Sequence, residues 1–124
     1  MVELKLLIID DSEDDAFILV REIQSGGFKC TWTRIETEKE LRAHITGEWD
    51  FIFIDYSMPQ FNAMEALRII KEQNTDVPCI VVSGQVGEET AVAAMKAGAH
   101  DYIQKGNYAR LVPAVQRELK DYQK

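Results

Sequence analysis

The stretch Phe-Ile-Phe-Ile-Asp-Tyr-Ser-Met-Pro, residues 51–59, decides how the rest of the sequence is interpreted. Its four consecutive apolar residues are too few for a helix and are rich in β-branched and aromatic types, so they predict a strand buried on both faces of a parallel sheet. Asp55 follows at the carboxyl end of this strand. Open α/β sheets bind ligands at that edge, which makes Asp55 a candidate for chemistry, although an aspartate that caps a loop fits this stretch equally well.

The composition limits what kind of protein carries this strand. A chain of 124 residues with 46% hydrophobic and 28% charged residues predicts one globular domain, residues 1–124. The net charge of −7 argues against direct binding to nucleic acid, because that affinity depends on clustered lysine and arginine. No apolar run is long enough to span a membrane and no signal-peptide pattern is present, so we predict a cytoplasmic protein without membrane contact. Cys30 and Cys79 fit no metal or redox spacing and are predicted to be reduced core residues.

Apolar runs and helix signals alternate along the sequence. The predicted strands lie at residues 4–9, 28–35, 51–54, 79–82 and 100–104. The predicted helices begin after the capping residues Ser12 and Thr37, near Ala63, at Gly87 and at Leu111. Strands that alternate with helices in this way predict a parallel sheet covered by helices.

Two of these segments carry predictions about which side chains are buried. In the first helix, Phe17, Val20 and Ile23 recur at helical spacing and are predicted to face the core. The strand at residues 28–35 alternates between apolar and polar residues, which predicts a half-exposed strand at the edge of the sheet. Trp32 lies on its apolar face and is predicted to be a packing residue, as is Trp49.

Right-handed crossovers predict a doubly wound α/β fold, with a five-stranded parallel sheet in the flavodoxin-like order 2-1-3-4-5 and five helices. This topology brings the polar residues that follow four of the strands to one crevice. They are Asp10, Asp11, Asp55, Ser83 and Lys105. Three carboxylates so close together repel one another unless a cation offsets them.

The chemistry of this set points to a phosphate and a metal. Hard oxygen ligands beside an open position suit Mg²⁺, which binds through one or two carboxylates and a phosphate oxygen. The ammonium of Lys105 and the hydroxyl of Ser83 could hold the remaining oxygens of a phosphoryl group. The whole set therefore outlines a phosphoryl-transfer site, whereas each residue alone fits a cap, a turn or a surface charge.

The sequence resembles the receiver domain of two-component response regulators along essentially its whole length. The matching motifs are Ile-Ile-Asp-Asp ending at Asp11, Asp-Tyr-Ser-Met-Pro beginning at Asp55, Val-Val-Ser-Gly around Ser83 and Asp-Tyr-Ile-Gln-Lys ending at Lys105. Each motif alone is weak, but four in this order with these separations are highly specific. The resemblance implies a phosphorelay signalling module that is not an enzyme, beyond catalysing its own phosphorylation and dephosphorylation.

The resemblance also implies a role for each matching residue. Asp55 would be the phosphoacceptor, usually supplied by the phosphohistidine of a histidine kinase or by a phosphotransfer protein. Asp11, Asp55 and the main-chain carbonyl of Ser57 would ligate Mg²⁺ directly, and Asp10 would act through a bound water. Lys105 would pair with the phosphoryl oxygens.

Ser83 and Tyr102 match the two switch positions of the family. Phosphorylation of Asp55 would add charge and acceptor oxygens beside Ser83, whose hydroxyl would gain a charge-assisted partner. Tyr102, which by itself fits a half-exposed strand aromatic, would then turn inward and change the surface of the fourth helix, fifth strand and fifth helix. A downstream effector or an attached output domain would use that surface, and a homodimer is also compatible with the resemblance.

Two positions near the site depart from the family pattern. Ala63 stands where the family usually has glycine, so we predict a turn there without a positive φ. Gly106 replaces the proline that commonly follows the lysine. We therefore predict a trans Lys105–Gly106 bond, because a cis bond before a residue other than proline costs about 2.5 to 4 kcal/mol. Gly106 would supply the bend by other dihedrals, and Asn107 would be free to cap the next turn.

The end of the sequence carries two further expectations. Pro113 is tolerated only in a first turn, so the last helix should begin near Leu111 or Val112. Because no DNA-binding or catalytic segment follows it, we expect either a stand-alone receiver or a piece of a larger sensor kinase or regulator. Lys-Gly in place of Lys-Pro, with Ala-Arg-Leu-Val-Pro-Ala-Val after it, is similar to receivers attached to hybrid sensor kinases.

Three other functions would use some of the same residue types. A Mg²⁺-dependent phosphatase of the haloacid dehalogenase type also has an aspartate nucleophile, but it needs a second aspartate where Ser57 stands. A dinucleotide-binding unit needs a glycine-rich loop where this chain has Asp-Asp-Ser-Glu-Asp-Asp, which rules it out. A receiver-like interaction module that is not phosphorylated stays open, although the presence of Asp55, Ser83 and Lys105 argues against it.

Overall fold

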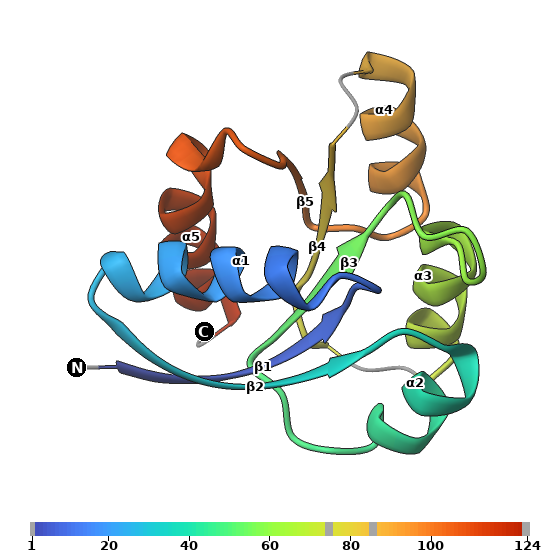
Figure 1. Ribbon diagram of the computed structural model, residues 1–124, viewed down its shortest axis with the longest axis horizontal. Helices are drawn as coiled ribbons and strands as arrows, with labels where there is room; N and C mark the ends of the chain where they lie inside the picture. The colour runs from blue at the N-terminus through green and yellow to red at the C-terminus, as the bar shows by residue number, and fades with distance from the viewer. Residues whose placement is uncertain (1, 74–75, 85–86, 123–124) are drawn as a thin grey trace.

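The computed structural model describes residues 2–73, 76–84 and 87–122. Strands and helices alternate along the chain, as Figure 1 shows. Their bounds are β1 (Val2–Ile9), α1 (Glu13–Ser25), β2 (Phe28–Ile35), α2 (Glu38–His44), β3 (Phe51–Asp55), α3 (Ala63–Glu72), β4 (Cys79–Ser83), α4 (Glu88–Lys96), β5 (Asp101–Gln104), the short 3₁₀ helix η1 (Tyr108–Arg110) and α5 (Leu111–Tyr122). Within these ranges, no helix combines the length and the apolar character that crossing a membrane requires.

The strands form one parallel sheet in the order β2-β1-β3-β4-β5. This order confirms the predicted doubly wound fold and places β2 at an edge. The register pairs Ile9 with Ile54, Asp55 with Val82 and Ser83 with Gln104. The carboxyl ends of β1, β3, β4 and β5 are therefore nearly level, and the residues that end these strands or follow them lie at one edge of the sheet.

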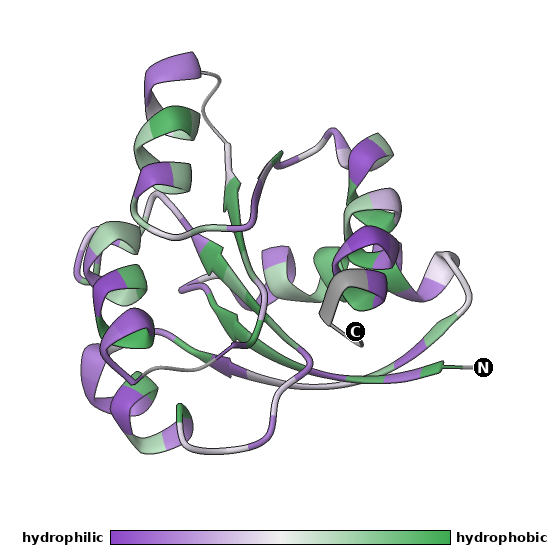
Figure 2. Ribbon diagram, turned by 180° about the vertical axis from the view of Figure 1, so that it is seen from behind, coloured by the Kyte–Doolittle hydropathy of each residue, from purple (hydrophilic) through white to green (hydrophobic). Residues whose placement is uncertain are grey.

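Two layers of helices explain why β3 is apolar without interruption. Phe51 and Phe53 belong to the core cluster formed with α1 and α5, whereas Ile52 and Ile54 belong to the one formed with α2 and α3. Side chains of a strand point alternately to its two faces, so both faces of β3 must be apolar. Figure 2 shows the central strands as mainly hydrophobic, and the helices as hydrophilic and hydrophobic in turn.

The predicted capping residues start the first two helices. The Ser12 hydroxyl accepts a hydrogen bond from the main-chain N–H of Asp15 at 3.1 Å, and the Thr37 hydroxyl accepts one from the N–H of Glu40 at 3.1 Å. The Glu40 carboxylate accepts a bond from the N–H of Glu36 in return. These bonds satisfy N–H groups that have no partner inside the helix, so α1 can begin at Glu13, a short loop after the end of β1.

The predicted burial of Phe17 and Trp32 is wrong. The side chain of Phe17 is 51% exposed and that of Trp32 is 41% exposed. The buried face of α1 is formed instead by Ala16, Leu19, Val20 and Ile23, and Phe17 lies beside this face, at a rotation of about 100° from Ala16. Both aromatic rings line a groove between α1 and the edge strand β2, where they stay exposed to solvent.

Other local predictions are confirmed. Ala63 is the first residue of α3, so the chain enters this helix there without a positive φ. Pro113 is the third residue of α5, which begins at Leu111. Cys30 and Cys79 are buried free thiols.

The loop after β5 bends in the predicted way, with one correction. Every peptide bond of the described residues is trans, and Gly106 has a φ of 82°, a conformation that favours glycine. The side chain of Asn107 makes no capping hydrogen bond to η1, which is the correction. The turn is closed by the main chain instead, because the N–H of Asn107 donates to the carbonyl of Gln104 at 3.1 Å.

Candidate functional site

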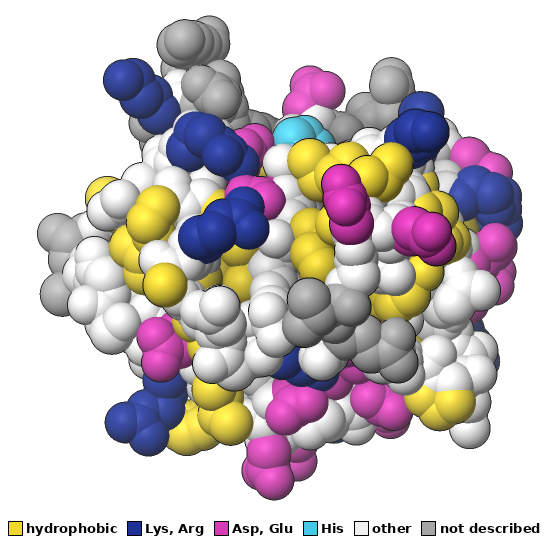
Figure 3. All heavy atoms as spheres, turned by 90° about the horizontal axis from the view of Figure 1, so that it is seen from above, with side chains coloured by type: hydrophobic (Ala, Val, Ile, Leu, Met, Phe, Trp, Pro, Cys, Tyr) yellow, Lys and Arg dark blue, Asp and Glu magenta, His cyan; other side chains and the backbone are white. Residues whose placement is uncertain are grey.

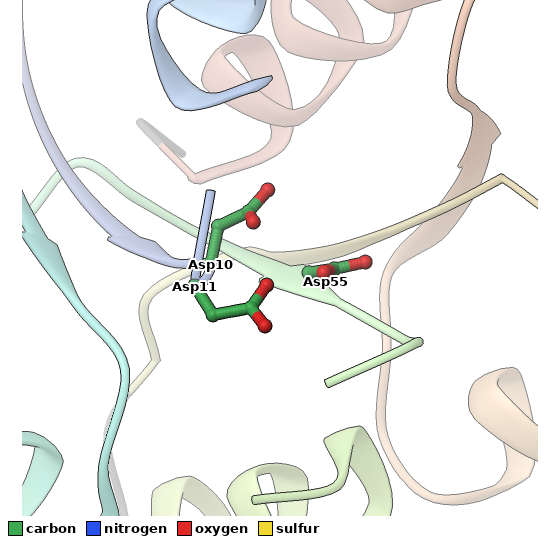
Figure 4. Close-up of side chains that lie close together, drawn as sticks. All are labelled: Asp10, Asp11 and Asp55. Atoms are coloured by element: carbon green, nitrogen blue, oxygen red, sulfur yellow. The ribbon is translucent and has the colours of Figure 1, made fainter. Parts of the chain in front are cut away.

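Three carboxylates meet at the carboxyl edge of the sheet. Asp10 and Asp11 follow β1 and Asp55 ends β3, and one oxygen from each lies within 4.8 Å of the others. Figure 4 shows the three side chains reaching the same side of the strand ends. Asp10 is 4% exposed and Asp55 5%, whereas Asp11 is exposed to solvent. The sequence-based expectation that these residues lie together is thus met.

Main-chain groups hold the two buried carboxylates. The N–H of Ser12 donates to Oδ1 of Asp10 at 2.8 Å, and the N–H of Ser57 donates to Oδ1 of Asp55 at 3.2 Å. Each bond joins a carboxylate to the residue two positions later, in the loop that leaves the strand. The loop conformation therefore fixes where these oxygens point, which a freely rotating side chain would not do.

Lys105 lies among carboxylates. Its ammonium nitrogen is 2.8 Å from Oδ2 of Asp15, 3.2 Å from Oδ2 of Asp10 and 3.3 Å from Oδ1 of Asp55. The first two contacts are hydrogen bonds. Asp15 was not among the site residues expected from the sequence.

Burial and the charges in the crevice together shift the pKa values of Asp10 and Lys105. Burial raises the pKa of Asp10 and the nearby Asp55 adds to this, although the Ser12 N–H and Lys105 act in the opposite direction. Burial works against the charged form of Lys105. Its hydrogen bond to Asp15 and the charges of Asp10 and Asp55 outweigh burial, so the pKa of Lys105 is raised. The lysine is therefore a firmly charged group in a crevice with excess negative charge.

The remaining expected residues surround this cluster. Ser83 ends β4 and is fully buried, and its carbonyl accepts a 2.7 Å bond from the N–H of Lys105. Tyr102 in β5 is half-buried and packs against the core cluster on the α3 side. Ser57 is exposed in the loop after β3.

The sequence did not predict the bonds that two arginines make to Asp101. The buried carboxylate of Asp101 accepts bonds from Arg110 and Arg117, each at 2.8 Å. Arg110 also donates to the carbonyl of Tyr102 at 3.2 Å. These bonds tie the side chain of Asp101 and the carbonyl of Tyr102, at the start of β5, to η1 and α5. Partners that lie 9 and 16 residues apart give no sequence pattern that predicts their contact.

The donor set fits a hard divalent cation. Carboxylate oxygens are the ligands that Mg²⁺ prefers, and three that lie within 4.8 Å of one another leave a negative charge for it to offset. The Ser57 carbonyl lies in the loop next to Asp55 and could add a fourth oxygen. The residues present are therefore compatible with a bound Mg²⁺.

One prediction follows from this charge excess. Asp10→Asn should raise the free energy of unfolding in the absence of divalent cations, because it removes a buried charge that lies beside the carboxylates of Asp11 and Asp55. The amide oxygen keeps an acceptor for the Ser12 N–H. Urea unfolding with EDTA measures the effect, and Mg²⁺ should then stabilise the wild type more than the variant. A variant less stable than the wild type in EDTA would show that the Asp10–Lys105 attraction outweighs the repulsion.

The comparisons with known proteins agree with this geometry. Residues 6–116 match the family model of the response regulator receiver domain. The chain belongs to this family. This receiver domain is 32% identical over 117 residues to the nitrogen assimilation regulatory protein NtrX of Azorhizobium caulinodans. The alignment covers 92% of this chain and 26% of that protein. The chain thus spans about a quarter of the length of this relative.

Solved structures have the same fold as this receiver domain. The receiver domain of the Francisella response regulator 1452 superposes with a TM-score of 0.80 at 26% identity, covering 96% of this chain and 98% of that one. The receiver domain of the histidine kinase CKI1 from Arabidopsis thaliana, complexed with Mg²⁺ and BeF₃⁻, has a TM-score of 0.76 at 24% identity. That alignment covers 94% of this chain and 90% of the other, and it supports the fold alone.

Proposed function

We propose that this receiver domain takes a phosphoryl group onto Asp55 in a two-component phosphorelay. The observation that carries the proposal is the placement of a buried carboxylate 3.3 Å from a charged lysine and beside two further carboxylates at the ends of parallel strands. An oxygen of Asp55 would form a P–O bond while the P–N bond of a phosphohistidine breaks, and the electron pair of that bond stays on the imidazole. The donor would be a histidine kinase or a phosphotransfer protein.

The chain's own groups would manage the charge of this transfer. Asp10, Asp11, Asp55 and the Ser57 carbonyl would hold Mg²⁺, which supplies positive charge for the phosphoryl oxygens when bound. Lys105 would pair with one of the remaining phosphoryl oxygens. Positioned charges of this kind commonly contribute about 10²- to 10³-fold to rate, which makes Lys105 the residue outside the metal ligands with the largest expected effect.

The output would be a change in the surface around α4, β5 and α5. Ser83 would turn its hydroxyl toward a phosphoryl group on Asp55, and Tyr102 would follow into the space near the core. Two large apolar side chains of α4, Val92 and Met95, are 45% and 44% exposed. Figure 3 views the molecule from the α4 end and shows hydrophobic side chains with acidic and basic ones around them. We propose this surface as the contact for an effector, an output domain or a second copy.

The same site argues against a phosphatase. Ser57 lies two residues after Asp55, where a general acid would be needed, and a serine hydroxyl does not serve as one at neutral pH. A cytoplasmic location, a single domain and the lack of direct contact with nucleic acid stay predictions from the sequence.

The proposal is tested by phosphorylation with a small donor. Incubated with acetyl phosphate and Mg²⁺, the wild type should take up a phosphoryl group that chelation of the metal prevents. A phosphate-affinity gel measures the modified fraction. No uptake with Mg²⁺, in protein shown to be folded by circular dichroism, would favour a receiver-like module that is not phosphorylated.

A further inference from the structure

Lys105 is shared between the proposed phosphorylation site and a carboxylate outside it. Its hydrogen bonds go to Asp15 at 2.8 Å and to Asp10 at 3.2 Å, and Asp55 is reached only as a 3.3 Å ion pair. The shortest of the three contacts is therefore with Asp15. This residue is not part of the carboxylate cluster that Asp10, Asp11 and Asp55 form.

The position of Asp15 is built into the start of α1. Its N–H donates to the capping hydroxyl of Ser12 at 3.1 Å, and the Ser12 N–H donates to Asp10 at 2.8 Å. The helix start is thus tied to the same carboxylate that Lys105 contacts. The side chain of Lys105 is 19% exposed and that of Asp15 is 41% exposed, so water screens their attraction only in part.

We propose that Asp15 is a positioning residue that restrains Lys105 and thereby weakens the binding of a phosphoryl group at Asp55. This inference rests on the proposed phosphorylation of Asp55. An ammonium has three N–H donors, and in this structure they face three carboxylates. To give a phosphoryl oxygen a short charge-assisted bond, Lys105 must move toward Asp55 and lengthen its 2.8 Å contact with Asp15.

The contact between Asp15 and Lys105 would shift the equilibrium between the unphosphorylated and phosphorylated states. A carboxylate that competes for the lysine favours the unphosphorylated state, because the phosphorylated state gains only the difference between two ion pairs. A partly exposed ion pair contributes little, so the competition should change the affinity for a phosphoryl analogue by about two- to fivefold. Asp15 would therefore adjust the switch without being needed for it.

The test measures the affinity for beryllofluoride, a phosphoryl analogue, in the presence of Mg²⁺ by isothermal titration calorimetry. Asp15→Asn should bind it about two- to fivefold more tightly than the wild type. Asp14→Asn is the matched control, because it removes the same charge from the same helical turn, and the ion pairs of Lys105 within the described ranges are with Asp10, Asp15 and Asp55. Asp15→Glu keeps the charge within reach and should restore an affinity near that of the wild type.

Three results would overturn the inference. They are Asp15→Asn binding no more tightly than the wild type, Asp14→Asn gaining as much as Asp15→Asn, or Asp15→Glu gaining as much as Asp15→Asn. The first result would show that Asp15 does not weaken the binding of a phosphoryl group. The second would show that the gain comes from the loss of any negative charge in this helical turn, and the third that it comes from the shape of the side chain. Failure of the proposed function is separate, since wild-type protein would then take no phosphoryl group from acetyl phosphate.

Discussion

Replacing Lys105 by alanine should slow phosphorylation of Asp55 by acetyl phosphate about a hundredfold while the protein stays folded. The ammonium lies 3.3 Å from Oδ1 of Asp55, so it is placed to offset the charge of an incoming phosphoryl group. The fold should survive because Lys105 follows β5 at a crevice and belongs to neither core cluster. The time course of uptake at saturating Mg²⁺ measures the effect, and circular dichroism checks the fold.

The variant Lys71→Ala is a matched control for this result. Lys71 lies in the last turn of α3, is exposed, and is outside the charged cluster. Its removal should leave the rate of phosphorylation unchanged. A Lys105→Ala protein that is phosphorylated as fast as this control would show that the lysine has no part in the transfer, and unfolding in Mg²⁺ would show that its role is mainly structural.

Replacing Phe53 by alanine should lower the free energy of unfolding by about 3 to 5 kcal/mol. Phe53 is 1% exposed in the central strand, and its ring stacks on that of Phe51 with the centroids 5.9 Å apart. Truncation would leave a cavity that β3 cannot close, because helices cover both faces of the sheet. Urea unfolding measures the loss, which is large compared with the total stability of a typical small domain.

Phe17→Ala provides the control of the same residue type. Because Phe17 is 51% exposed on α1, its truncation should change the free energy of unfolding by less than about 0.5 kcal/mol. Equal losses for the two variants would contradict the difference in burial between the two rings. A loss below about 1 kcal/mol for Phe53→Ala would contradict the close packing around the central strand, since removing a phenyl ring from a filled core position costs more than that.

The two phenylalanines also show where the sequence is informative about the fold. Four apolar residues before Asp55 leave few alternatives to a strand buried on both sides, and the structure has that strand. Helical spacing shows that α1 has an apolar face, but it does not show where this face ends. Phe17 lies just beyond that limit, in the groove between α1 and the edge strand β2, and it stays exposed. Trp32 lines the same groove and is exposed as well.

The site likewise contains residues that the sequence predicts and residues that it does not. Asp10, Asp11 and Asp55 could be expected together because parallel strands end at one edge, and this requires only the strand order. Asp15 could not be placed, because its contact with Lys105 depends on the direction in which α1 leaves the sheet. The bonds from Arg110 and Arg117 to Asp101 depend likewise on the packing of η1 and α5 against β5. Short motifs predict the residues on the strands, whereas charge pairs between elements require the tertiary structure.

The identity of the modified residue tests the central claim most directly. Intact-mass analysis of wild type and Asp55→Ala, each incubated with acetyl phosphate and Mg²⁺, should show one phosphoryl adduct on the wild type and none on the variant. The variant must be folded, and beryllofluoride binding to the wild type alone would support the same assignment. An equal adduct on Asp55→Ala, or none on the wild type, would contradict the assignment of Asp55 as the phosphoacceptor.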